Sequence, residues 1–317
     1  MVEITGGCIF IVGHERSGTS LVRAILQAQG SFAIPPTDAD IFTLIEQHRC
    51  GEVADPLIFD ALRTNEKLIP WGIDWDGIAK NFTSEKINKN ALFKTILENY
   101  WQKYSAAKPA LKRPKYELRV DQIRQIFPDS RFIALIRDPR AVLASKKYYK
   151  GKIGTSWNIA NFVYLRLLTS ILRWRKSVEA IRNVEKSLGA ANVLVVRYEH
   201  LVLDPEKTIE QIFSFTGDKF DNQAIYKKIG SGFKTNSTFT SNSNDRYIFR
   251  KEAIDRWKDK LHPVELWLIE KALGNIMKEE EMIPSHPVLS LTELITGKMN
   301  LMFYFFIKLF RYQLERR

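Results

Sequence analysis

The amino-acid sequence predicts an α/β fold in which a central parallel sheet lies between flanking layers of helices. Support comes from three short apolar segments, which are residues 8–12, 131–136 and 192–196. They lack polar–apolar alternation, are rich in β-branched or aromatic residues, and each leads into a turn and a helical pattern, as strands buried on both faces do. Because strands that alternate with helices favour a parallel sheet, we expect ligands to bind at the carboxyl ends of these strands.

Helical patterns follow the strands and fill the long intervals between them. Asp204 is a suitable N-cap and Pro205 suits the first helical position, so a helix is expected from there to about Phe215. His262 and Pro263 begin another helix that runs through about Lys278. The remaining expected helices span residues 19–29, 38–49, 91–105, 118–127, 138–145 and 156–188.

The composition is that of an ordinary globular protein with an excess of positive charge. Its 317 residues are 45% hydrophobic and 26% charged, which excludes a disordered, collagenous or low-complexity chain. The formal net charge of +12 predicts an anionic partner, which could be nucleic acid, an acidic lipid surface or a phosphate-bearing small molecule. We find no nucleic-acid-binding motif, and two cysteines are too few for a disulfide scaffold. The N-terminus lacks the pattern of a signal peptide, so we expect a cytoplasmic location.

The strongest local motif is a phosphate-binding loop, residues 13–20, between the first strand and its helix. Backbone N–H groups at such a turn converge on an anion, and two glycines allow close approach. The motif nearly matches the ATP-binding P-loop, but Thr19 stands where the lysine is required, and the positive charge lies in the loop as Arg16. The nearest acidic candidate for holding Mg²⁺ is Asp138, which is flanked by Arg137 and Arg140. We therefore expect a P-loop-like site that binds an anion through side-chain cations, with no metal.

A second anion site is expected after the second strand. Arg137 emerges at the carboxyl end of that strand, and Ser145 follows about two helical turns later. An arginine fork and a hydroxyl can hold a second phosphate group. A basic run follows, which is either part of this site or a solvated loop, and it consists of Lys146, Lys147, Lys150 and Lys152.

Three ordered blocks carry a family resemblance: GHERSGTSLVRAIL, FPDSRFIALIRDPRAVLAS and VVRYEHLVLDPEKTIEQIFSFTG. They resemble the signature blocks of sulfotransferases that use 3′-phosphoadenosine 5′-phosphosulfate (PAPS), most closely the branch of tyrosylprotein sulfotransferases and their bacterial homologues. The resemblance spans about residues 8–216. It implies a P-loop-like three-layer fold with PAPS as co-substrate. The expected division is a single α/β domain over residues 1–290, with a helical insertion at about 38–127.

The resemblance also assigns cofactor-binding positions. The loop for the 5′-phosphosulfate maps onto five consecutive residues, Arg16, Ser17, Gly18, Thr19 and Ser20. The 3′-phosphate site maps onto Arg137 and Ser145, and Tyr198 would lie near the adenine. The alternative for Tyr198 is an aromatic residue that only caps the core.

Catalytic roles follow from the same resemblance. Lys112, in a Lys-x-Pro element, would contact the transferring sulfonate and the leaving phosphate oxygen together with Arg16, although Arg113 leaves the choice of cation open. Asp38 is the first choice for the general base and Asp40 the second. The alternative for Asp38 is a cap of the next helix.

Two residues of the loop are harder to assign. His14 is a further candidate for the general base because it adjoins the phosphate-binding residues. Glu15 brings a negative charge to an anion site, so we expect it to point away or to pair with an arginine.

Two further segments are candidates for accessory roles. Residues 231–250 are expected to form a mobile loop that closes over the cofactor and offers Arg246, Arg250 or Lys251. Residues 291–317 are expected to form an aromatic and basic amphipathic helix. It either lies on a membrane surface or packs on the domain or on a second subunit. Its expected polar stripe consists of Asn300, Tyr304, Lys308, Arg311 and Glu315.

The leading hypothesis is a sulfotransferase that moves a sulfonate from PAPS to a hydroxyl or amine by metal-free in-line displacement. One alternative is a P-loop nucleotide kinase or NTPase, which the missing lysine disfavours. Another is a non-catalytic basic binder of nucleic acid or membranes. The acceptor stays open among a glycan, a lipid, a peptide tyrosine and a small metabolite.

Overall fold

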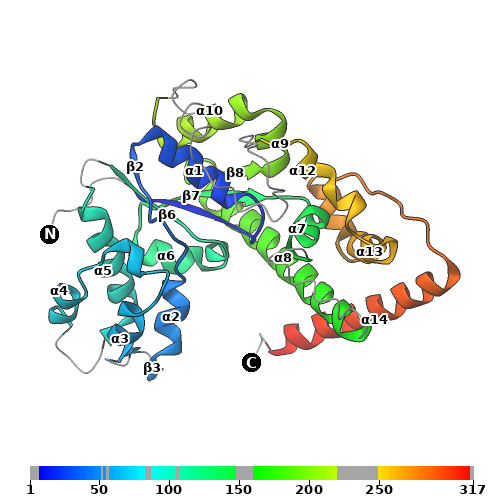
Figure 1. The fold of residues 1–317 in the computed structure, drawn as a ribbon, viewed down its shortest axis with the longest axis horizontal. Coiled ribbons are helices and arrows are strands. Elements are labelled where there is room, and N and C mark those ends of the chain that lie inside the picture. The colour runs from blue at the N-terminus through cyan, green and yellow to red at the C-terminus, as the bar shows by residue number, and fades with distance from the viewer. Residues whose placement is uncertain are drawn as a thin grey trace.

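The central sheet has five strands, all parallel, in the order β2-β6-β1-β7-β8 (Figure 1). The computed structural model describes residues 7–50, 53–54, 57–82, 87–104, 107–147, 160–219 and 249–314. In chain order the strands of this sheet are β1 (Ile9–Gly13), β2 (Phe32–Ala33), β6 (Lys108–Lys112), β7 (Arg131–Ile136) and β8 (Val193–Arg197). The three apolar segments thus form neighbouring strands, which confirms the predicted parallel sheet.

Two strands of the sheet were not predicted. β6 has the sequence KPALK, in which lysines occupy both ends and a proline the second position, so it lacks the apolar run that identifies the other strands. It nevertheless pairs with β1 through Ala110 and Leu111, both of which are buried. β2 is only two residues long.

Helices cover both faces of the sheet, which confirms the three-layer architecture (Figure 1). Ile9 and Ile11 of β1 pack in a core cluster with α1 (Thr19–Gln29), α9 (Tyr198–Leu203) and α10 (Pro205–Thr216). Phe10 and Val12 point to the other face. The helices whose residues pack in the cluster on that face include α5 (Lys89–Gln102), α6 (Val120–Ile126) and α8 (Ala160–Leu188).

The predicted helix starts at prolines are confirmed. The Asp204 side chain accepts a hydrogen bond from the Lys207 N–H at 3.4 Å, and Pro205 takes the first position of α10. His262 caps α13 (Pro263–Glu279) in the same way, with Glu265 completing a capping box. α7 (Pro139–Lys147) begins at its expected proline.

The interval 38–127 holds short elements beside α5, α6 and β6. The helical ones are α2 (Ile41–Gln47), α3 (Ile58–Arg63), α4 (Trp75–Lys80) and the 3₁₀ helices η1 (Ile69–Trp71) and η2 (Tyr116–Arg119). A small antiparallel sheet joins β3 (Arg49–Cys50), β4 (Val53–Ala54) and β5 (Ile87–Asn88). The division of the chain at residue 290 stays a prediction.

The C-terminal helix α14 (Leu291–Leu314) packs against α13 and α8 (Figure 1). Its approach to α13 is close, because a Cβ on Gly297 would lie 2.9 Å from the Trp267 ring. The predicted polar stripe is wrong at Tyr304, which is fully buried, whereas its neighbour Phe306 is 66% exposed. Of the expected polar stripe, Tyr304 therefore contacts the protein.

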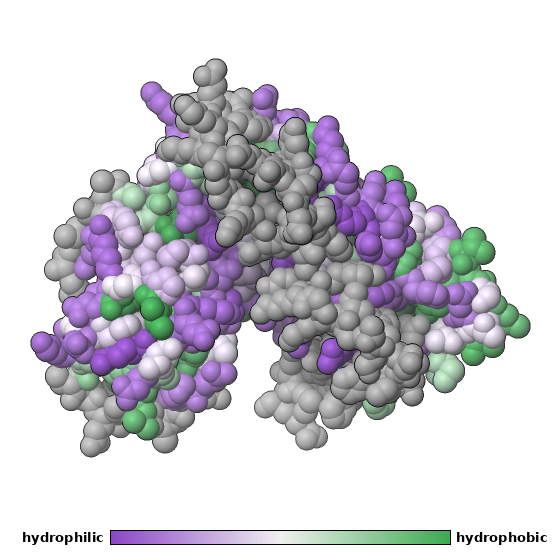
Figure 2. All heavy atoms as spheres, in the orientation of Figure 1, coloured by the Kyte–Doolittle hydropathy of each residue, from purple (hydrophilic) through white to green (hydrophobic). Residues whose placement is uncertain are grey.

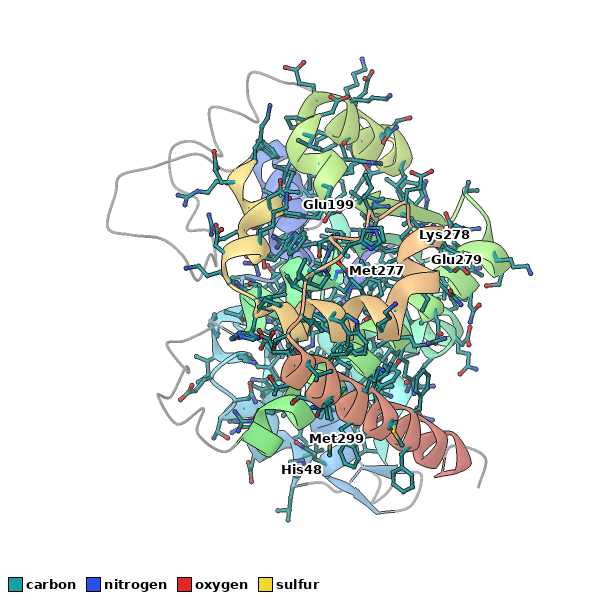
Figure 3. The ribbon with its side chains drawn as sticks, turned by 90° about the vertical axis from the view of Figure 1, so that its right-hand side faces the viewer. His48, Glu199, Met277, Lys278, Glu279 and Met299 are labelled. Atoms are coloured by element: carbon teal, nitrogen blue, oxygen red, sulfur yellow. The ribbon has the colours of Figure 1, made fainter. Side chains whose placement is uncertain are left out.

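The outward face of α14 is apolar. Figure 3 shows the helix across the face turned toward the viewer, with Met299 on it, and this methionine is exposed. Hydrophobic surface also gathers at the right-hand edge of Figure 2, where Figure 1 places the beginning of α14. The exposed apolar residues at the beginning of α14 and just before it are Ile283, Val288, Leu291 and Ile295. Of the helices in the described ranges, none combines the length and apolar character needed to cross a membrane.

Candidate active site

The loop between β1 and α1 has the backbone conformation of an anion-binding turn. Gly13, Arg16 and Gly18 have positive φ angles of 133°, 74° and 100°. A side chain at Gly13 would lie 2.5 Å from the Leu135 carbonyl oxygen, and one at Gly18 would lie 2.5 Å from the ring of Tyr198. Both glycines are therefore required, because the loop fits closely between the ends of β7 and β8.

The two predicted anion sites form one continuous cluster. Arg16 Nε donates a hydrogen bond to Ser145 Oγ at 2.9 Å. Arg137 Nη1 donates to the Arg16 carbonyl oxygen at 3.0 Å, and Nη2 donates to the Ala253 carbonyl oxygen at 2.9 Å. The loop, the end of β7 and α7 thus bring their cations and hydroxyl to the same edge of the sheet.

Tyr198 belongs both to the core and to this cluster. Its side chain packs in the core cluster that includes α1 and α10, and the residue is 8% exposed. The Arg137 guanidinium carbon lies 3.9 Å from the centre of its ring. Glu199, labelled in Figure 3, accepts a hydrogen bond from the Asp138 N–H at 2.9 Å and so ties the end of β8 to that of β7.

The predicted catalytic pair lies in direct contact. Lys112, at the end of β6, is 4% exposed, and its ammonium group forms an ion pair with Asp38. Burial lowers the pKa of Lys112 below its ordinary value, and the Asp38 carboxylate partly offsets this effect. Arg23 Nη1 lies 3.3 Å from the other carboxylate oxygen, so Asp38 faces two cations.

Asp40, rather than Asp38, caps the next helix. Its carboxylate accepts a hydrogen bond from the Thr43 N–H at 3.3 Å, and α2 begins at Ile41 rather than at residue 38. Arg113 Nη2 lies 2.6 Å from the same carboxylate. Burial alone would raise the pKa of Asp40, but the hydrogen bond from Arg113 holds it below its ordinary value. The predicted cap at Asp38 is therefore wrong, and the cap is Asp40, which also pairs with Arg113.

His14 is buried and neutral at physiological pH. Burial lowers its pKa to about 4, and the charge of Lys146 adds to this effect. Its Nδ1 lies 2.7 Å from the Glu15 carbonyl oxygen, which can only accept, so Nδ1 carries the proton and Nε2 is the basic nitrogen.

Glu15 pairs with lysines rather than with the expected arginine. Lys115 Nζ lies 2.8 Å and Lys146 Nζ 3.6 Å from its carboxylate. Burial opposes ionisation, but the hydrogen bond from Lys115 and the two positive charges lower the pKa of Glu15 to about 2. Lys147 pairs with Glu265 at 2.8 Å. Lys150, Lys152, Arg246 and residues 231–248 lie outside the described residues.

Two neighbours of the site, Trp174 and Arg256, could not be predicted, because no local motif marks them. Trp174 Nε1, on the long helix α8, donates to the Arg137 carbonyl oxygen at 3.0 Å. Arg256 follows α12 (Glu252–Asp255) and lies close enough to Arg250 and Arg137 that burial and their charges lower its pKa. Both residues come from separate parts of the chain, and only the folded structure brings them to the end of β7.

Two buried polar atoms in the cluster suit a ligand with phosphate-like groups. Ser17 Oγ and Arg137 Nε are buried, and neither has a hydrogen-bond partner among the described residues. Buried donors are normally satisfied, so a ligand that accepts hydrogen bonds fits these positions. Within the same ranges, no group of three or more His, Cys, Asp or Glu residues is arranged to hold a metal ion.

Fold and site together define a P-loop-like α/β protein whose anion-binding loop lacks the lysine of the ATP-binding motif. The chain belongs to the sulfotransferase family, whose model matches residues 8–222. The predicted family is therefore confirmed.

Curated relatives agree with this assignment. Protein-tyrosine sulfotransferase 2 of Gallus gallus is 25% identical over 254 residues, which cover 78% of this chain and 62% of the relative. Protein-tyrosine sulfotransferase A of Caenorhabditis elegans is 24% identical over 258 residues, which cover 80% of this chain and 61% of the relative. Nodulation protein NoeE of Sinorhizobium fredii (strain NBRC 101917 / NGR234) is 23% identical over 296 residues, with 86% and 63% covered. The chain thus spans about three fifths of the length of these relatives.

Solved structures support the fold. The sulfotransferase domain from the curacin biosynthetic pathway matches with a TM-score of 0.55 at 17% identity, covering 88% of this chain and 98% of that one. The sulfotransferase domain of the Synechococcus PCC 7002 olefin synthase matches with a TM-score of 0.54 at 19% identity, covering 86% and 97%.

Proposed function

We propose that this protein transfers a sulfonate from PAPS to a hydroxyl or amine of an acceptor by in-line displacement without a metal ion. The observation that carries the proposal is the hydrogen bond between Arg16 and Ser145, with Arg137 bonded to the Arg16 carbonyl. It unites the loop expected to bind a 5′-phosphosulfate with the residues expected to bind a 3′-phosphate. Such a site suits a nucleotide that carries anionic groups at both its 5′ and its 3′ positions.

Each end of the donor has residues that suit it. The backbone N–H groups of residues 16 and 18–20 and the Arg16 side chain bind the 5′ end, where the dipole of α1 adds attraction. Arg137 and Ser145 bind the 3′-phosphate, and Tyr198, whose ring lies against the Arg137 guanidinium, is near the adenine. Ser17 Oγ and Arg137 Nε are available as donors, which supports the fit.

When bound, PAPS supplies an activated sulfonate whose bond to the leaving 5′-phosphate oxygen breaks as the acceptor attacks. Lys112 and Arg16 stabilise the negative charge that grows on that oxygen. Asp38 accepts the proton of the acceptor hydroxyl or amine. The Lys112–Asp38 ion pair holds both groups in place before the reaction, since each restricts the rotamers of the other.

The first acceptor to examine is a peptide tyrosine, because several relatives are named protein-tyrosine sulfotransferases. A glycan, a lipid and a small metabolite complete the set of acceptors. The cytoplasmic location, a membrane contact and a homodimer through α14 stay predictions.

The test follows release of 3′,5′-ADP and addition of one sulfonate mass to acceptors from these four classes, with PAPS as donor. We expect turnover by the wild type without added metal. Asp38→Asn should bind 3′,5′-ADP within about threefold of the wild type and lose about 100-fold or more in kcat, as removal of a general base does. Turnover with ATP and Mg²⁺ and none with PAPS would instead support the kinase alternative.

A further inference from the structure

A buried carboxylate lies beneath the phosphate-binding loop and has no part in the proposed chemistry. Glu117, in η2, is only 2% exposed. Its Oε2 accepts a hydrogen bond from the Gly13 N–H at 3.0 Å, and its Oε1 accepts one from the Ser177 hydroxyl at 2.5 Å. Gly13 ends β1 and begins the loop, while Ser177 lies on α8. The carboxylate therefore joins the base of the loop to the layer of helices behind it.

Lys112, the last residue of β6, directly precedes the short segment that carries Glu117. The Arg113 N–H donates to the Ile11 carbonyl oxygen at 3.0 Å, and the Lys115 N–H donates to that of Gly13 at 3.2 Å. With the bond from Gly13 to Glu117, residues 113–117 are tied to the end of β1 at three points. Lys112 itself pairs with Ile11 in the sheet, so this segment links the strand that carries Lys112 to the base of the phosphate-binding loop.

We propose that Glu117 is a positioning residue that fixes the phosphate-binding loop relative to Lys112. This inference rests on the proposed function, in which the loop and Lys112 hold the reacting group between them. The Gly13 N–H is directed to Glu117, so the contacts with the anion fall to the later amides and to Arg16. A displacement of about 1 Å at such a site costs roughly 100-fold in rate.

A purely space-filling role does not need a carboxylate. Burial raises the pKa of the Glu117 carboxyl, and the hydrogen bond from Ser177 opposes this rise. A buried acid is costly unless it is hydrogen-bonded, whereas an apolar side chain of similar size carries no such cost. Both oxygens have partners, and one of these partners is the backbone of the loop.

The experiment compares Glu117→Leu, Glu117→Gln and Glu280→Leu with the wild type in the full-length chain. Glutamine retains an acceptor for Gly13 and offers an amide to the Ser177 hydroxyl. Glu280 is a matched control because it is 3% exposed and accepts hydrogen bonds from Arg182 at 2.7 and 2.6 Å. Each variant is measured for hydrogen–deuterium exchange of a peptide covering residues 11–20, for melting temperature, and for kcat and donor KM in sulfonate transfer.

We expect Glu117→Leu to raise amide exchange in residues 11–20 by about tenfold or more, and to lower kcat by about tenfold or more with a smaller change in KM. Glu117→Gln should stay within about threefold of the wild type in both. Glu280→Leu should lower the melting temperature and leave exchange in this peptide and kcat unchanged. Unchanged exchange in Glu117→Leu, or equal losses in Glu117→Gln, would overturn the proposal.

One further variant, and the exchange data taken alone, keep the outcome clear. If Glu117→Leu does not fold, Ser177→Ala should still raise exchange in residues 11–20 by a smaller factor, and no change there would overturn the proposal. If the wild type transfers no sulfonate, the proposed function fails, and the exchange data alone decide whether Glu117 holds the loop.

Discussion

A double-mutant cycle across Asp38 and Lys112 measures how strongly the two side chains act as one unit. The Lys112 side chain is 3% exposed and that of Asp38 is 27% exposed, so the pair lies between a surface ion pair and a fully buried one. Exposed pairs contribute about 0.2–1 kcal/mol, whereas removal of one partner from a buried pair costs about 3–5 kcal/mol. Arg23, 3.3 Å from Asp38, remains as a second partner for the carboxylate.

The exposed fractions of the two side chains set the expected losses in the free energy of unfolding. Asp38→Asn leaves a buried ammonium group without its carboxylate and should lower the free energy of unfolding by about 3 kcal/mol. Lys112→Met removes that ammonium group and leaves Asp38 paired with Arg23, at a cost of about 1 kcal/mol. The double variant should lose about 2 kcal/mol rather than the sum, which gives a coupling of about 2 kcal/mol.

The pH dependence supplies an independent check. Burial lowers the pKa of Lys112, and loss of Asp38 lowers it further. The unfolded chain then binds more protons than the folded chain, so the stability of Asp38→Asn recovers as pH rises toward the ordinary lysine pKa of about 10.4.

Urea unfolding followed by tryptophan fluorescence, at pH 7 and at pH 9.5, measures all of these quantities. A coupling below about 0.5 kcal/mol, together with a deficit that does not change with pH, would refute the inference that the two groups form one buried pair.

Three further predictions concern the cofactor site, the loop and the C-terminal helix. Arg137→Ala should weaken 3′,5′-ADP binding by about 10- to 150-fold in calorimetry, since one charge-assisted contact contributes about 1.5–3 kcal/mol; a change below threefold would remove it from the site. The pKa of His14 is about 4 in the folded protein, so between about pH 6.5 and 4 the unfolded chain binds a proton that the folded chain does not. The free energy of unfolding should therefore fall by up to about 3 kcal/mol as pH drops through this range. His14→Gln should abolish this slope in thermal unfolding. Tyr304→Ala should cost about 3–5 kcal/mol and Phe306→Ala less than about 0.5 kcal/mol in urea unfolding; equal effects would contradict the orientation of α14.

The sequence predicts the fold best where one local signal dominates. The apolar runs of β1, β7 and β8, and the prolines at the starts of α10 and α13, mark elements whose stability depends on nearby residues. β6 lacks such a signal because its lysines interrupt the apolar pattern, and one of them, Lys112, is proposed to act in the reaction. A residue proposed to act in the reaction thus interrupts the apolar pattern by which its strand would be predicted.

The site was predictable where the topology of a parallel sheet brings residues together. Arg16 and Ser145 are 129 positions apart, yet both follow neighbouring strands and meet at one edge. The sequence does not show which of Asp38 and Asp40 caps α2, since an aspartate before a helix suits a cap and a base equally well. The lysine partners of Glu15 and the Glu117–Gly13 bond depend on long-range packing that no local pattern reports.

The orientation of α14 shows a different limit. A helical period reveals that a segment has two unlike faces, but not which face contacts the protein. Tyr304 fills a buried position with its ring, so this member of the expected polar stripe faces inward.

The central claim is that the carboxyl edge of the sheet holds a donor site for a 3′-phosphorylated nucleotide. A thermal-shift titration of the wild type tests this claim most directly. The ligands are 3′,5′-ADP, AMP and ATP with Mg²⁺. We predict stabilisation chiefly by 3′,5′-ADP, of about 2.7 kcal/mol when its concentration is 100 times its Kd. An equal response to ATP with Mg²⁺, or no response to 3′,5′-ADP, would contradict the claim.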